Sequence, residues 1–213
     1  MLTVDETNNA ALCEALVAID SRFLDVFTTY GPAPLSSRPQ GFATLVQLSL
    51  EQQVSVSSGR ATVERLETYA GGLQPVLLLN IDDETARGLG ISRQKAGYIR
   101  GLAADVLEGR LNVDALATLP DEEVCEYLMR VKGIGTWTAR TYLLVALSRA
   151  DAWPHGDVAL HAAMQAAFGA RGLVQARHES QRLSQRGCCA AEPAFERPHP
   201  TDFAAPRCPG DVR

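Results

Sequence analysis

The sequence contains no apolar run long enough to cross a bilayer, and residues 1–6 are acidic and lack the apolar stretch of a signal peptide. We therefore expect no membrane partner and a cytoplasmic location. The five cysteines are scattered and include no Cys-x-x-Cys pair, which argues against a disulfide framework, a zinc site or an iron–sulfur cluster. No segment alternates between apolar and polar residues over a useful length, so strands are not expected. These absences predict an all-α protein.

Positive charge is also scarce in the chain as a whole, with 20 Lys and Arg against 25 Asp and Glu and a formal net charge of −5. That total argues against a general nucleic-acid binder, but the distribution of charge matters more. Residues 1–86 hold four basic and eleven acidic side chains, residues 87–149 hold nine and seven, and residues 150–213 hold seven of each. A surface that binds a polyanion should therefore lie in the central segment.

Apolar residues recur at three- and four-residue steps through much of the chain up to about residue 170, which indicates amphipathic helices. Ser92 and Asp157 stand where N-caps are expected, and the Gly71-Gly72 pair is typical of a helix end. The predicted helices cover residues 10–30, 41–51, 57–69, 82–87, 92–108, 122–130, 136–149 and 157–168. Together they predict one helical domain over residues 1–170.

The most informative stretch lies between two of these helices, where Gly133 and Gly135 flank the apolar residue Ile134. Glycine adopts positive φ without a Cβ clash and lets another backbone approach closely. Free N–H groups at the start of the second helix, with the positive end of its dipole, form an anion site. Ile134 can anchor the turn to the core, and Lys132 and Arg140 can add positive charge. The alternative is an ordinary helix–loop–helix connection with solvated basic side chains.

Four short motifs follow one another along the chain: residues 51–56 (EQQVSV), 89–99 (LGISRQKAGYI), 128–139 (LMRVKGIGTWTA) and 156–160 (GDVAL). They resemble the DNA-inserting loop, a helix start, the hairpin and the catalytic-aspartate segment of the helix-hairpin-helix (HhH-GPD) DNA glycosylases. The similarity is greatest to the 3-methyladenine DNA glycosylase II branch. It implies a two-lobed helical fold with an N-terminal helix at 10–30, a helical barrel lobe at about 40–150 and a catalytic helix at 157–168.

The resemblance also implies an activity, the excision of alkylated, 3-methyladenine-type bases from damaged double-stranded DNA by a monomeric enzyme of base excision repair. A base within a duplex must first be rotated out of the stack. Hydrolysis of its N-glycosidic bond then leaves an abasic site. Family members that also cleave the strand carry a nucleophilic lysine where this chain has Trp137, so no lyase activity is expected.

Three side chains take functional roles by this resemblance. Asp157 is the catalytic carboxylate, because it can stabilise positive charge on the sugar and orient the attacking water. Trp137 is a wall of the base pocket, since an indole face attracts a positively charged alkylated purine. Gln53 fills the gap left in the duplex, although the closest branch has an apolar wedge there. The alternatives are a helix cap for Asp157, core packing for Trp137 and a surface loop for Gln53.

Other roles fall on backbone groups of the hairpin. The phosphate-binding hairpin, by resemblance, consists of Lys132, Gly133, Ile134, Gly135 and Thr136. In the family, hairpin carbonyls also hold a monovalent cation, which would here be bound by Met129, Val131 and Gly133. No cofactor is required beyond such a structural Na⁺ or K⁺. The sequence departs from the family at Thr141, where a second pocket aromatic is usual.

The chain changes character after Arg171, where prolines interrupt every possible helix, and we expect residues 171–213 to be an atypical, poorly ordered tail. The family continues with a helix pair that this tail does not resemble. Without that pair, parts of the apolar faces of 10–30 and 41–50 should be exposed. A diverged or frame-shifted C-terminus leaves open a catalytically impaired helix-hairpin-helix DNA-binding protein. A third alternative is a protein-interaction domain whose hairpin is only a turn.

Overall fold

The computed structural model describes residues 2–168, and within them the chain is helical, with an isolated antiparallel bridge between Thr3 and Arg149 in place of a sheet. In chain order the α-helices and 3₁₀ helices (η) are α1 (Asn9–Ile19), η1 (Ser21–Phe23), α2 (Leu24–Tyr30), α3 (Phe42–Glu51), α4 (Val56–Ala70), α5 (Pro75–Leu78), α6 (Asp83–Gly88), α7 (Arg93–Leu107), η2 (Ala115–Thr118), α8 (Asp121–Met129) and α9 (Thr136–Val145). A further helical stretch covers residues 158–168. No helix in this described part is both long and apolar enough to cross a membrane.

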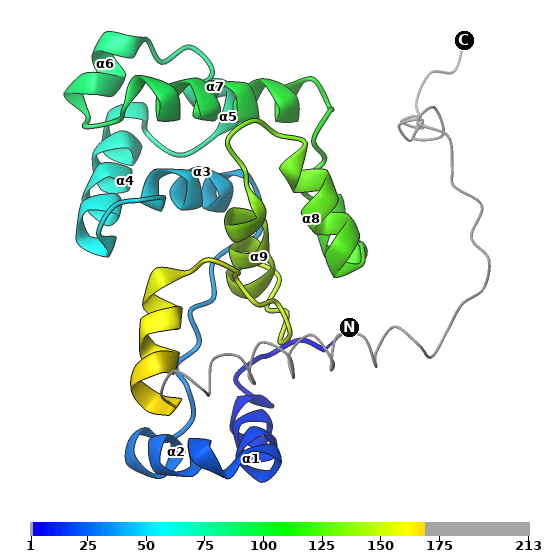
Figure 1. The fold of residues 1–213 in the computed structure, drawn as a ribbon. Coiled ribbons are helices and arrows are strands. Elements are labelled where there is room, and N and C mark those ends of the chain that lie inside the picture. Colours follow the sequence, from blue (N-terminus) through cyan, green and yellow to red (C-terminus); the bar gives the residue numbers. More distant parts are fainter. Residues whose placement is uncertain (1, 169–213) are drawn as a thin grey trace, which may run out of the picture.

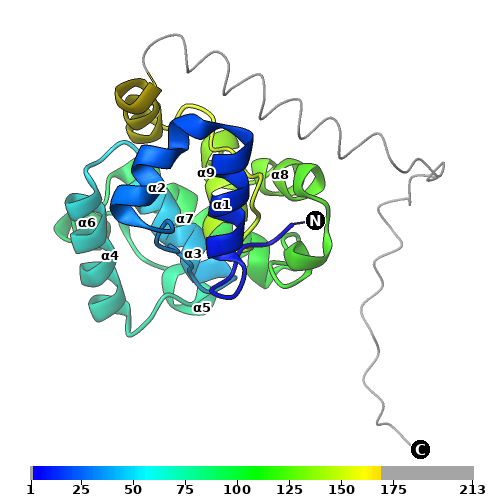
Figure 2. The ribbon, with the colours of Figure 1, turned by 90° about the horizontal axis from the view of Figure 1, so that it is seen from below.

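The helices form two lobes (Figure 1). Helices α3 to α8 make the larger lobe, and α9 extends from it toward the smaller lobe formed by α1, α2 and the helix at 158–168. Seen from below, α1 and α2 lie over α3 and α9 (Figure 2). Phe168 meets Phe23 edge to face, with ring centroids 4.7 Å apart, which joins the helix at 158–168 to the N-terminal segment. The predicted two-lobed, all-α fold is confirmed.

Helix α3 is the centre of the larger lobe. It packs against α4, α7 and α9, and its buried residues are Phe42, Thr44, Leu45, Val46, Leu48, Ser49 and Leu50. Gly59 permits the close approach of α4, because a Cβ atom at that position would lie 2.9 Å from Cγ of Glu51. The last residue of α3, Glu51, is therefore packed against α4, and this contact fixes the position at which the following loop begins.

The helix boundaries follow local chemistry that the sequence predicts. Ser92 caps α7, and its hydroxyl accepts a hydrogen bond of 3.3 Å from the N–H of Lys95. Asp82 caps α6 in the same way, through the N–H groups of Glu84 and Thr85. Gly71 ends α4 in the left-handed conformation, with φ of 74°. The predicted cap at Ser92 and the predicted stop at Gly71 are confirmed, whereas Asp82, expected as the first residue of its helix, is the cap before it.

The prediction of one helix over residues 10–30 is wrong. The chain breaks at Asp20, whose backbone is extended with φ of −138° and ψ of 102°. The Asp20 carboxylate accepts the backbone N–H of Arg22 at 3.0 Å and also binds its guanidinium. An aspartate that bonds its own neighbouring backbone competes with helical hydrogen bonding, so two short helices flank a 3₁₀ turn.

The exposure expected for the two apolar faces is confirmed for the first and wrong for the second. No residue of α1 or α2 is buried, and the side chains of Leu16 and Ile19 are 43% and 71% exposed. Residues 41–50 are instead largely covered by α4, α7 and α9. The tail predicted at 171–213 lies outside the described residues.

Candidate nucleic-acid interface and active site

The predicted hairpin joins α8 to α9 and is a tight turn. Ile134 is 5% exposed, and its N–H donates to the carbonyl oxygen of Val131 at 3.1 Å, so it anchors the turn as expected. Gly135 is the N-cap residue of α9 and provides no side chain to cap the helix. The first-turn N–H groups of α9 therefore face outward without a side-chain cap, which is the arrangement that binds anions.

The two glycines of the turn serve different purposes. Gly133 has φ of 96°, and a Cβ atom there would lie 2.4 Å from the ring of Tyr98. Gly135 has an ordinary extended backbone, with φ of −101° and ψ of 178°, and a Cβ atom there would meet nothing within 4 Å. Gly133 is thus required by the fold, whereas the space at Gly135 is open on the outer side of the turn.

Lys132 and Arg140, the two basic residues expected to add charge near the hairpin, have different surroundings. Lys132 and Thr136 are exposed on the turn. Arg140 points to α8 instead, where its guanidinium lies 3.7 Å from the carboxylate of Glu122. Neither of the two roles considered for Arg140, hairpin charge or simple solvation, describes this contact.

Trp137 and Asp157 meet across the gap between α9 and the helix at 158–168. The indole N–H of Trp137 donates to Oδ2 of Asp157 at 3.0 Å. The other carboxylate oxygen, Oδ1, accepts the backbone N–H of Leu160 at 2.8 Å, so Asp157 also caps its helix. Both side chains are half-buried. A partly enclosed carboxylate therefore meets the N–H edge of an indole that stands in the first turn of α9, directly after the hairpin.

Of the neighbouring residues of α9, Tyr142 points away from this pair. Tyr142 is fully buried, and its hydroxyl oxygen accepts the N–H of Gly41 at 2.9 Å; burial raises the pKa of this phenol. The Thr141 hydroxyl donates to the carbonyl oxygen of Trp137 at 2.7 Å. Tyr142 stands five residues after Trp137, which at about 100° per residue places it about 140° around the helix, and it faces elsewhere as expected.

Gln53 lies in the loop between α3 and α4, where it is exposed and has φ of 56°. A residue other than glycine rarely adopts this left-handed conformation, and it does so where the surroundings hold the backbone. Lys95 holds this backbone by donating to the carbonyl oxygen of Gln52 at 2.8 Å, and Gln52 in turn donates to the carbonyl oxygen of Gly133 at 3.1 Å. Both residues lie within the motifs at 51–56 and 89–99, which are the signal that could have marked them, but their contacts depend on packing that leaves no period in the sequence.

The three carbonyl groups predicted to hold a cation lie at the end of α8 and in the turn. The oxygen of Val131 accepts from Ile134, and that of Gly133 accepts from the side chain of Gln52 at 3.1 Å. Met129 is the last residue of α8, where carbonyl groups lack helical partners. Carbonyl oxygens of this kind suit a monovalent cation. Among the described residues, no cluster of His, Cys, Asp or Glu could hold a metal ion.

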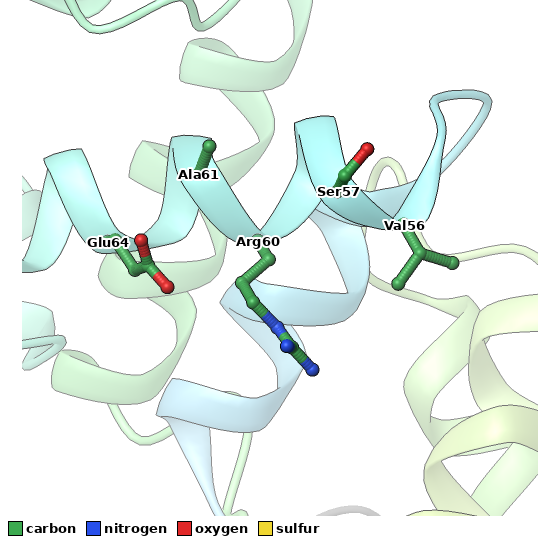
Figure 3. Close-up of a pocket in the computed structure, with 5 residues that line it drawn as sticks. All are labelled: Val56, Ser57, Arg60, Ala61 and Glu64. Atoms are coloured by element: carbon green, nitrogen blue, oxygen red, sulfur yellow. The ribbon is translucent and has the colours of Figure 1, made fainter.

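A surface hollow of about 540 Å³ runs along α4 and is lined by Val56, Ser57, Arg60, Ala61 and Glu64 (Figure 3). All of these residues come from one helix, and neither Trp137 nor Asp157 contributes to it. It is therefore an open groove beside the Gln53 loop and not a pocket for an extruded base.

Two curated proteins from yeasts are similar in sequence to this chain. DNA-3-methyladenine glycosylase 1 of Schizosaccharomyces pombe is 25% identical over 143 residues, which are 65% of this chain and 63% of the relative. DNA-3-methyladenine glycosylase of Saccharomyces cerevisiae is 30% identical over 130 residues, which are 56% of this chain and 44% of the relative. The chain spans about half the length of the curated relatives it matches.

Solved structures share the fold. A DNA-3-methyladenine glycosidase from Bacillus halodurans superposes with a TM-score of 0.65 at 32% identity, covering 79% of this chain and 78% of that one. The sequence also matches the family described as HhH-GPD superfamily base excision DNA repair protein over residues 46–188, which extends past residue 170. This match covers more than half of the 213 residues. The chain therefore belongs to the HhH-GPD superfamily of base excision DNA repair proteins.

Proposed function

We propose that this protein is a monofunctional DNA glycosylase that excises alkylated, 3-methyladenine-type bases from damaged duplex DNA by hydrolysis, acting as a monomer. The observation that carries the proposal is the Trp137–Asp157 pair, in which Trp137 stands in the first turn of α9, the helix that begins at the hairpin without a side-chain cap. The names of the relatives support the substrate class, since the proteins from both yeasts are 3-methyladenine glycosylases.

Asp157 supplies the chemistry in this proposal. As the glycosidic bond lengthens, its electron pair leaves with the base and positive charge builds on the sugar. A carboxylate beside the sugar stabilises that charge and orients a water molecule whose oxygen bonds to C1′. The proton lost by the water passes to Asp157 or to solvent. The products are a free base and an abasic site.

Trp137 favours alkylated bases over normal ones. Alkylation at purine N3 or N7 leaves a positively charged ring, and an indole face attracts a cation by about 1 to 2 kcal/mol. A normal purine is neutral and gains no such contribution. Thr141, whose hydroxyl bonds back to α9, adds no second aromatic face. We therefore expect selectivity for bases that are both cationic and weakly attached to the sugar.

Hydrolysis without strand cleavage is the proposed reaction because no amine stands at the position of Trp137. Strand-cleaving glycosylases form a Schiff base between a lysine and the sugar. This chain has two lysines, Lys95 and Lys132. Lys95 donates to two backbone carbonyls and Lys132 lies on the hairpin, so neither lysine takes the position of a nucleophile at the sugar.

The hairpin anchors the DNA in this proposal, with residues 132–136 holding a backbone phosphate by N–H groups and by the charge of Lys132. Such contacts position the protein without reading sequence. We also propose that the carbonyls of Met129, Val131 and Gly133 hold Na⁺ or K⁺. The cation would contribute positive charge near the bound phosphate.

The deciding experiment is base release from methylated duplex DNA, identified by mass spectrometry, with Asp157→Asn as the matched variant. The proposal expects release of 3-methyladenine, an alkali-labile product strand, and loss of release in the variant with duplex binding retained. Salt-dependent binding with no base released from methylated or deaminated duplex would instead identify a DNA-binding protein that lacks activity. Absence of duplex binding at low salt would favour a protein-interaction domain.

A further inference from the structure

Lys95 connects α7 to the end of α3. Its ammonium group donates to the carbonyl oxygens of Leu50 at 2.7 Å and Gln52 at 2.8 Å. These carbonyls belong to the last turn of α3 and the start of the Gln53 loop, where helical partners are missing and the helix dipole is negative. Lys95 is half-buried there, and desolvation lowers its pKa. It therefore fixes the backbone immediately before Gln53.

The side chain of Gln52 connects the same loop to the hairpin. Its amide Nε2 donates to the carbonyl oxygen of Gly133 at 3.1 Å and to the hydroxyl oxygen of Thr138 at 2.8 Å. Thr138 is 1% exposed, so this acceptor lies inside the protein. The two bonded partners stand 81 and 86 residues away in the sequence. We call these two hydrogen bonds the Gln52 latch.

Helix α7 contacts the hairpin beside the latch. Tyr98, one turn after Lys95, lies against Gly133 closely enough to exclude a Cβ atom there. The Tyr98 hydroxyl also accepts the side-chain amide of Gln94 at 2.6 Å, which holds the ring in place. One helix start thus contacts both the loop, through Lys95, and the hairpin, through Tyr98.

We propose that Gln52 and Lys95 are positioning residues for Gln53, whose side chain would fill the gap left in the duplex and is called the plug below. They hold the plug at a fixed distance and orientation from the phosphate-binding hairpin. This inference rests on the proposed function. Flipping a base requires the plug to enter the stack at one defined step relative to the phosphate that the hairpin holds. Gln52 is adjacent to Gln53, and its amide grips the hairpin itself, so a phosphate bound at the hairpin determines where the plug enters.

The positive φ of Gln53 fits this role. A left-handed conformation costs a residue other than glycine roughly 1 to 2 kcal/mol, and it persists only when neighbouring contacts hold it. The Lys95 bond to the Gln52 carbonyl and the Gln52 bonds to the hairpin fix the peptide on the near side of Gln53. Ser55, which caps α4, fixes the far side. The plug is therefore presented before DNA arrives.

The first test compares Gln52→Leu, which removes both hydrogen bonds of the latch, with Thr138→Val, which removes the bond to Thr138 alone; both changes alter the shape of the side chain little. Thr138→Ser restores the hydroxyl acceptor and is the rescue variant. Release of methylated bases from duplex DNA should fall about tenfold in the first two variants, as expected for the loss of hydrogen bonds worth about 1.4 kcal/mol. Release from the same DNA kept single-stranded should change less than about twofold, because an unpaired base needs no plug.

Lys95 is tested by a second matched pair. Lys95→Met keeps the aliphatic stem and loses both donated bonds, whereas Lys95→Arg keeps a positively charged donor. For Lys95→Met, release of methylated bases should fall about tenfold on duplex DNA and change less than about twofold on single-stranded DNA, as for the first pair of variants. Arginine should recover most of the duplex activity. Equal loss on duplex and single strands for Gln52→Leu, Thr138→Val and Lys95→Met would overturn the proposal, as would no loss at all.

A fluorescence experiment separates this inference from the proposed activity. A duplex carries 2-aminopurine opposite a stable abasic analogue, and binding of the wild-type protein should change the fluorescence as the plug contacts that base. Gln52→Leu and Thr138→Val should bind this duplex and give a smaller change. The measurement needs no catalysis, so it tests whether the latch positions Gln53 even if the protein releases no base. A wild-type protein that binds without any fluorescence change, or variants with the full change, would contradict the inference.

Discussion

The indole nitrogen of Trp137 lies 3.0 Å from Oδ2 of Asp157 and donates a hydrogen bond to it, while Oδ1 of the same carboxylate accepts the N–H of Leu160. Each oxygen of Asp157 is therefore held by a different element, one by α9 and one by the helix that Asp157 begins. Helix capping and catalysis are not exclusive roles at this position. The cap fixes the carboxylate to its own helix, and the indole fixes it relative to the hairpin.

The Trp137→Phe variant separates the two roles of this indole. Phenylalanine keeps an aromatic wall but cannot donate to Asp157. Because a hydrogen bond to a charged group contributes about 1.5 to 3 kcal/mol, kcat for base release should fall by about tenfold to a hundredfold. Single-turnover release from methylated duplex measures this. An unchanged kcat with a weaker preference for cationic bases would assign Trp137 to the wall alone.

Asp157→Asn and Asp157→Ala form a second matched pair. Asparagine caps a helix as well as aspartate, so the Asn variant should keep its thermal unfolding temperature within about 2 °C and lose base release at least about a hundredfold. Alanine should lose release equally and also destabilise the protein by about 1 kcal/mol through the lost cap. Thermal unfolding and base release measured on both variants provide the comparison. Substantial release by the Asn variant would show that the carboxylate only caps.

Local chemistry made most of the helices predictable. Ser92 and Gly71 act within a few residues of themselves, and the apolar periodicity marks each helix face. The break at Asp20 was missed because the periodicity continues through it, while the deciding hydrogen bond runs from a side chain to the backbone two residues on. Helix α5 (Pro75–Leu78) was also missed, since four residues are too few for a period and its packing against α7 is a tertiary contact.

The site was predictable in part. The resemblance brings Trp137 and Asp157 together, and the structure places them in contact. It could not show that Arg140 binds Glu122, nor that Gln52 reaches Gly133, because each contact depends on how segments distant in the sequence pack together. Long-range polar contacts of single side chains carry no repeat along the sequence. They become visible only when the packing of the larger lobe is known.

Substitution of the two glycines of the hairpin should affect different properties, stability for Gly133 and duplex binding for Gly135. Gly133→Ala introduces a Cβ atom against Tyr98 at a positive φ, so it should destabilise the protein by about 2 kcal/mol or more. Gly135→Ala enters open space with an extended backbone and should cost less than about 1 kcal/mol. Its methyl group would stand where a phosphate approaches. We therefore expect weakened duplex binding from a protein of near-normal stability.

Urea unfolding and fluorescence anisotropy on labelled duplex measure these two effects separately. Normal duplex affinity in Gly135→Ala would place the phosphate elsewhere. Normal stability in Gly133→Ala would mean that Tyr98 moves aside at little cost.

The stability of the junction between α6 and α7 should depend on acid pH. Asp83 accepts from Arg100 at 2.8 Å, and this bond, together with the charges of Arg100 and Arg93, lowers the pKa of Asp83 below the ordinary value of 3.8. Because the folded state binds the proton less readily than the unfolded state, the carboxylate stabilises the fold above pH 3.8. That contribution is lost as the pH falls through the lowered folded-state pKa.

The measurement compares urea unfolding of wild-type protein and Asp83→Asn from pH 7 to pH 3. The wild-type advantage should be constant near neutral pH and shrink on acidification. A difference that stays flat or grows toward low pH would show that the ion pair does not stabilise the fold, as is common for exposed pairs.

Gln53→Gly and Gln53→Leu test the plug against its own backbone strain. Glycine adopts the φ of 56° freely, so Gln53→Gly should be as stable as wild type or more stable by up to about 1 kcal/mol. With no side chain to fill the vacated gap, it should release paired methylated bases about tenfold more slowly, equivalent to about 1.4 kcal/mol. Leucine supplies an apolar wedge and should retain most of the release while losing any hydrogen bond to the orphaned base. Thermal unfolding and single-turnover release on duplex distinguish these outcomes. A Gln53→Gly variant with full activity on duplex DNA would show that Gln53 does not fill the gap left by the extruded base. The enzyme would then rotate the base out of the stack without any side chain at position 53.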